Sequence, residues 1–131
     1  MRKFRFFYWY LPAIMWGGLL ILLTSLPDLS APELGIEIED KIYHLLFYAA
    51  FAFLWARADI QGKSARFKLG LLRSGLFLSA FACLDELHQL VIPGRDCSFA
   101  DGIADILGII LGLFLFKILF NRMLSFERAL D

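Results

Sequence analysis

Four apolar segments, each close to the length that crosses a membrane, dominate this 131-residue chain. They cover approximately residues 6–26, 42–58, 69–92 and 102–120, and a spanning helix needs roughly 20 apolar residues. Hydrophobic residues make up 60% of the sequence, whereas a soluble domain usually holds about 45–50%. We therefore expect an all-α, polytopic membrane protein with four transmembrane helices, folded as a single domain over residues 1–131.

The basic residues predict how such a chain would be oriented. Eleven of the 13 Lys and Arg residues lie near the two termini or around the connection between the second and third segments. Only Lys41 and Arg95 lie elsewhere, and the connection over residues 27–40 is acidic. The positive-inside rule then predicts that both termini are cytoplasmic and that the 27–40 and 93–101 connections face outward. The formal net charge of zero gives no reason to expect a nucleic-acid partner.

A first polar group stands at the predicted outer end of the second segment. Asp40 and Lys41 precede His44 by four and three residues, and Tyr48 follows it by four, so neighbouring faces of one helix carry them. These side chains could bind a ligand at the outer surface. Asp40 could equally be a helix cap, Lys41 an interfacial anchor, and His44 a partner in a hydrogen bond between helices.

A second polar group, Asp85, Glu86, His88 and Gln89, lies in the third apolar segment. Ionisable residues at membrane depth cost about 2.5–3.5 kcal/mol each on insertion scales, and by default they indicate a functional site. If the helix ends near Ile92, Asp85 lies roughly 10 Å below that end. We expect Asp85 or Glu86 to act as a base, with His44 or His88 as its acid–base partner, if the site is catalytic.

A third group follows the turn signal Pro93-Gly94. Arg95 could pair with a carboxylate or hold a phosphate, and Asp101 and Asp105 share one face at the start of the fourth helix. Gly108 and Gly112 continue that face at the same spacing and predict close packing of another helix.

Two of these stretches resemble the VanZ-like family of small bacterial membrane proteins. They are DKIYHLLFY, beginning at Asp40, and DELHQLVIPGR with the following SFADGIADILGIILG, ending at Gly112. The resemblance covers about residues 40–120. The first segment matches the family only in being apolar and carries none of its motifs. Members of this family usually carry the pattern Asp-x-x-x-Asn at the start of the last helix, where this chain has Asp101 and Asp105. An ionised Asp105 cannot donate a hydrogen bond as the amide of Asn does. The resemblance implies a bacterial inner (plasma) membrane location and a link to the cell envelope, because the founding member is associated with resistance to a lipoglycopeptide antibiotic.

Taken together, the sequence favours a binding protein with an outward-facing polar pocket for an envelope lipid or another amphipathic ligand, such as a lipid-linked precursor or an antibiotic. The main alternative is a membrane-embedded enzyme that acts on a lipid-linked or phosphorylated substrate by carboxylate and histidine acid–base chemistry. A transporter working as a homodimer and a scaffold also stay open. No cofactor motif is present, and Cys83 and Cys97 lack zinc spacing. A divalent metal among the carboxylates and histidines remains an alternative. The predicted substrate-binding residues are Asp40, Lys41, Tyr48, Gln89, Arg95, Asp101 and Asp105.

Overall fold

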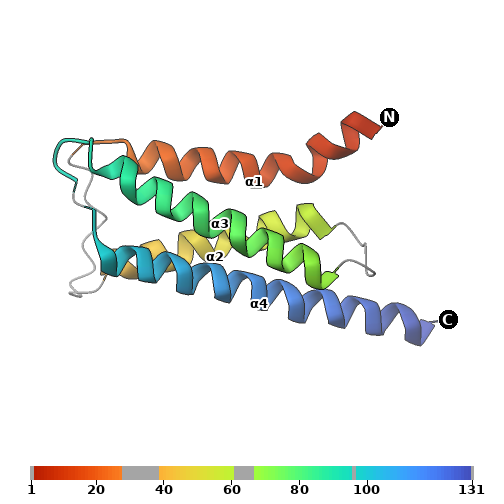
Figure 1. Ribbon diagram of the computed structural model, residues 1–131. Helices are drawn as coiled ribbons and strands as arrows, with labels where there is room; N and C mark the ends of the chain where they lie inside the picture. The colour runs from red at the N-terminus through yellow and green to blue at the C-terminus, as the bar shows by residue number, and fades with distance from the viewer. Residues whose placement is uncertain (1, 28–38, 61–66, 96, 131) are drawn as a thin grey trace.

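The computed structural model describes residues 2–27, 39–60, 67–95 and 97–130, which form four α-helices with their adjoining turns (Figure 1). These helices are α1 (Arg2–Thr24), α2 (Glu39–Ile60), α3 (Phe67–Gln89) and α4 (Phe99–Leu130). Most of the predicted acidic connection 27–40 and the middle of the basic connection between α2 and α3 lie outside the described residues. The prediction of an all-helical chain with four helices is confirmed.

Each helix starts or ends a few residues away from the predicted boundary. The largest difference is in α4, which continues ten residues beyond residue 120 to Leu130 and extends past the other helices in Figure 1. In contrast, α3 ends at Gln89 rather than near Ile92. The chain there tightens into turns, in which Val91 N–H donates to the His88 carbonyl and Ile92 N–H to that of Gln89. Asp85 is therefore about 6 Å from the helix end instead of 10 Å.

Three of the four helices are long and apolar enough to cross a membrane, namely α1, α3 and α4. Large apolar side chains are exposed along all three, as expected for surfaces that lie in lipid. α2 is not among the three. It contacts each of the other helices and carries buried residues along most of its length. The charged residues near both ends of α2 agree with this central position, since a helix covered by protein can carry polar side chains that lipid would exclude.

Both chain ends lie at one end of the bundle, because the helices alternate in direction (Figure 1). We call this the terminal end. The opposite end is where α1 and α3 finish and where α2 and α4 begin, and we call it the carboxylate end for the side chains described below. An aromatic core between them includes Trp55 stacked on Phe77 at 4.1 Å and Tyr48 next to Phe51 and Phe81.

Candidate functional site

The carboxylate end is built around a very close contact between α2 and α4. A Cβ atom added at Gly108 would overlap the carbonyl oxygen of Leu45, and one added at Gly112 would overlap that of Ala49. Only glycine permits the two backbones to approach this closely. The packing face predicted for Gly108 and Gly112 therefore serves a contact between two helices of the same chain.

The same contact continues toward the helix starts as two polar pairs. Lys41 Nζ lies 3.1 Å from Asp101 Oδ1, and His44 Nδ1 lies 2.9 Å from Asp105 Oδ1. One stripe of α2 thus meets one stripe of α4, with polar pairs near the helix ends and glycines deeper. The spacing along each helix predicted which residues share a face, and the structure shows that the two faces meet.

Asp85 and Glu86 are adjacent in sequence but have different partners. Asp85 is buried and accepts hydrogen bonds from Thr24 Oγ1 at 2.7 Å and from the Tyr48 hydroxyl at 3.0 Å. This carboxylate therefore joins α3 to α1 and α2. Its hydroxyl partner Thr24 was missed by the sequence reasoning. The signal for it was a polar residue at the outer end of the first apolar segment.

Glu86 is also buried, and it faces the start of α4. Its Oε2 accepts a hydrogen bond from the Ser98 backbone N–H at 3.1 Å, and Gln89 Nε2 donates to Oε1 at 3.3 Å. The backbone N–H groups at a helix start favour a negative charge. Gln89 therefore forms a hydrogen bond with the carboxylate of Glu86 in the same helix, and the spacing of three residues allows this contact.

Two predicted site residues lie instead on the α1 side of this end. His88 is exposed, and its Nε2 is 3.0 Å from Ser25 Oγ. Arg95 donates to the backbone carbonyls of Leu23 and Leu26, at 3.0 Å and 3.4 Å. A guanidinium suits the unpaired carbonyls and partial negative charge at a helix C-terminus. Arg95 therefore fastens the turn before α4 onto α1, and no carboxylate is among the partners found for it in the described part of the chain.

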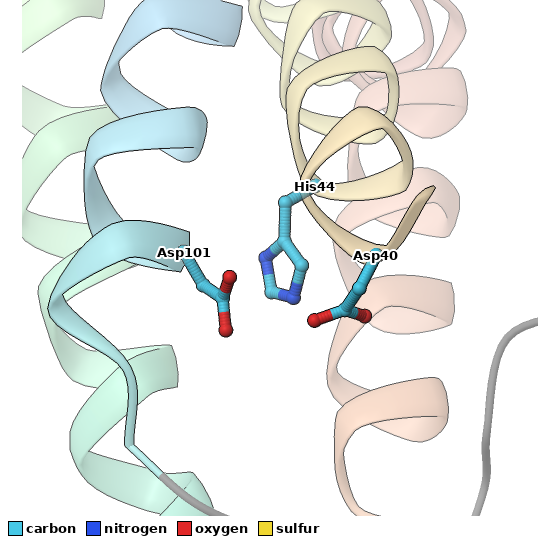
Figure 2. Close-up of side chains that lie close together, drawn as sticks. All are labelled: Asp40, His44 and Asp101. Carbon is cyan, nitrogen blue, oxygen red and sulfur yellow. The ribbon is translucent and has the colours of Figure 1, made fainter. Parts of the chain in front are cut away.

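His44 stands at the centre of the remaining cluster. It belongs to two groups whose potential ligand atoms all lie within 4.8 Å of one another: Asp40 with His44 and Asp101, and His44 with Glu86 and Asp105. Figure 2 shows the first group, with the imidazole of His44 on α2 between the carboxylates of Asp40 and Asp101. The second group lies deeper and joins α2, α3 and α4.

Among the residues that the structure describes, carboxylates outnumber the cations that face them at this end. Asp85, Glu86, Asp101 and Asp105 are buried, and Asp105 is 0% exposed. Among the described residues, the basic partners found for these four are Lys41 and His44. Asp105 Oδ2 has no hydrogen-bond partner in this part of the chain. Such an arrangement can accept hydrogen bonds, hold a cation, or exchange a proton between His44 and a carboxylate.

Three helices of membrane-spanning length and composition, assembled with a fourth into one bundle, make this chain a multi-pass membrane protein. Its sequence matches the family model described as VanZ/LLP1 over residues 7–120, and the chain belongs to that family. The match confirms the family resemblance and extends it to α1. A search of curated proteins found no match, and neither did a search of solved structures.

Proposed function

We propose that this VanZ/LLP1 protein binds the headgroup of an amphipathic cell-envelope molecule, such as a membrane lipid or a lipid-linked precursor, at the carboxylate end. The observation that carries the proposal is the excess of buried carboxylates around His44, in a bundle whose helices α1, α3 and α4 expose large apolar side chains. Ionised carboxylates accept hydrogen bonds and cannot donate them. The ligand that complements them best therefore presents ammonium or hydroxyl groups.

The upper part of the cluster gives the headgroup a place to bind. Asp40 is exposed, and the side chain of Lys41 retains 41% of its exposure while paired with Asp101. A donor group on the headgroup would meet Asp40 and Asp101, and Lys41 could turn toward a phosphate of the same headgroup. Arg95 is engaged with α1, so recognition of phosphate by this guanidinium is no longer the preferred interpretation.

The proposal includes the side of the membrane. The basic residues cluster at the terminal end and near the α2–α3 connection, which favours a cytoplasmic position for both termini. The carboxylate end then faces outward, where envelope precursors and antibiotics that act on them are found. An acyl chain of the ligand would lie along the exposed apolar surface of α1, α3 or α4.

Mass spectrometry of lipids that co-purify from the native membrane tests this function. We expect one headgroup class to be enriched over the bulk membrane extract, and its enrichment to fall at least tenfold in an Asp40→Asn, Asp101→Asn double variant. Asp59→Asn is the matched control, because it removes a carboxylate at the terminal end. If no class is enriched, or if the double variant retains the same enrichment, headgroup binding at this site is wrong.

A second candidate is an enzyme, and it is favoured by one contact. The 2.9 Å hydrogen bond between His44 and Asp105 orients the imidazole, as an acid–base histidine requires, and Glu86 lies in the same group. Incubation of the purified protein with the co-purified ligand would then yield a product of different mass. Glu86→Gln would abolish that product while ligand binding remained. A ligand mass that never changes on incubation argues for binding alone.

A further inference from the structure

We propose that a divalent transition-metal ion binds between His44, Glu86 and Asp105, below the level of Asp40 and Asp101. This inference goes beyond headgroup binding and does not depend on it. The three side chains come from α2, α3 and α4, so the ion would join the three helices.

The arrangement of the donor atoms supports such an ion. One ligand atom from each residue lies within 4.8 Å of the other two. His44 Nδ1 and Asp105 Oδ1 are 2.9 Å apart. If each were about 2.1 Å from one ion, they would subtend about a right angle, as neighbouring ligands of a six-coordinate ion do. An imidazole nitrogen with carboxylate oxygens, without thiolate, suits ions such as Mn²⁺ and Zn²⁺.

An unpartnered buried atom in the cluster is the second, independent observation. The Asp105 side chain has 0% relative exposure, and within the described residues its Oδ2 has no hydrogen-bond partner. A buried charged acceptor without a partner is costly, and polar groups in such positions are almost always satisfied. A metal ion held by Asp105 would offset the charge of this carboxylate and of Glu86 together.

The balance of charge in the cluster also favours a bound cation. Four carboxylates are buried in the described part of the chain, namely Asp85, Glu86, Asp101 and Asp105. A histidine that ligates a metal is neutral, so Lys41 is then the remaining cation paired with any of them in the described chain. One divalent ion together with Lys41 would offset three of the four negative charges. Burial of unpaired charge at membrane depth is expensive enough to make this compensation important.

The alternative group, Asp40, His44 and Asp101 in Figure 2, is a weaker candidate for the ion. Asp101 Oδ1 already forms an ion pair with Lys41, and Asp40 is exposed to solvent. An ion there would have to displace the ammonium group. Because the two groups share only His44, carboxylate variants can distinguish them.

The test uses the full chain, purified in detergent, stripped with a chelator and titrated calorimetrically with Mn²⁺, Zn²⁺ and Mg²⁺ in turn. We expect one equivalent of Mn²⁺ or Zn²⁺ to bind more tightly than Mg²⁺. Affinity should fall at least tenfold in Glu86→Gln and in Asp105→Asn. His88→Gln and Asp59→Asn are matched controls and should bind as the unmodified protein does, since neither residue belongs to the cluster.

Electron paramagnetic resonance of the Mn²⁺-loaded protein keeps the test decisive even if a variant misfolds. Coupling of the Mn²⁺ spin to an imidazole nitrogen is expected in the unmodified chain and in His88→Gln. Absence of bound metal, or bound Mn²⁺ without nitrogen coupling, would overturn the proposal. So would an ion lost in Asp40→Asn but retained in Asp105→Asn. The lipid experiment reads headgroup enrichment at Asp40 and Asp101, so the two proposals can fail separately.

Discussion

The two ends of the bundle hold charged side chains in opposite ways. At the terminal end, Arg73 Nη2 lies 2.9 Å from both oxygens of Asp59, and the Tyr10 hydroxyl donates to the same carboxylate. In this pair one cation matches one anion, and the arginine side chain is 54% exposed. At the carboxylate end, buried anions exceed their paired cations, and Asp105 is fully enclosed. The charges of the Arg73–Asp59 pair balance each other, whereas the buried carboxylates at the carboxylate end favour an additional cation or hydrogen-bond donor.

The largest effect is expected from the glycines that create the crowded end. Gly112→Ala would force its Cβ against the backbone of Ala49, which has no flexible end to move aside. We expect it to destabilise the protein by at least about 3 kcal/mol, at the upper end of the range for overpacking. Thermal unfolding in detergent measures this loss. Gly75→Ala is the control, because its Cβ would meet only Leu113 Cδ1 at 3.4 Å and should change stability little.

Removal of one cation at each end compares the ends directly. Lys41→Gln leaves Asp101 in a group of carboxylates without its ion pair, and we expect a loss of about 1–3 kcal/mol. Arg73→Gln breaks an exposed pair, and such pairs contribute less than about 1 kcal/mol. Chemical denaturation of both variants at the same ionic strength measures the difference. Equal losses of stability in the two variants would show that the carboxylate end depends on its cation no more than the terminal end does.

Neutralisation of one carboxylate at each end should change stability in opposite directions. In chelator-treated protein, Asp105→Asn removes a buried charge that has an unpartnered oxygen, and we expect stabilisation of about 1 kcal/mol. Asp59→Asn breaks a satisfied pair and should destabilise the protein slightly. Melting temperatures of the two variants in one buffer compare the signs. A loss of stability in Asp105→Asn would mean that the carboxylate is already compensated without an ion.

Helical spacing predicted the faces at the carboxylate end but not their partners. The three- and four-residue steps through Lys41 and His44, and through Asp101 and Asp105, placed each pair on one face. Spacing within one helix does not say which other helix it meets. The glycines gave the only hint, because they indicate a close neighbour without naming it.

Arg95 and His88 show where the sequence was insufficient. A guanidinium can donate to a carboxylate or to the free carbonyls at a helix end, and the sequence around Arg95 does not distinguish the two. His88 lies two residues from Glu86, which turns it roughly 200° around α3, and it meets Ser25 of the turn after α1. The order and type of the helices followed from hydropathy, since each apolar segment had to form a helix.

The smallest expected effect is a change in reactivity at Cys97, which reports the charge of the carboxylate end without altering its packing. Cys97 is exposed in the turn between α3 and α4. Local desolvation raises the pKa of its thiol, and the charge of Glu86 and a hydrogen bond to Glu86 raise it further. The thiolate is the reactive form, so a raised pKa slows labelling at pH values below it.

In Glu86→Gln the pKa should fall, and the labelling profile should shift to lower pH with a few-fold faster rate near pH 8. An impermeant maleimide applied to intact cells, in a Cys83→Ser background, measures both this rate and the side of the membrane. Unchanged labelling rates would show that Glu86 is neutral or too far from Cys97 to affect its pKa. Labelling only from the cytoplasm would contradict the proposed orientation.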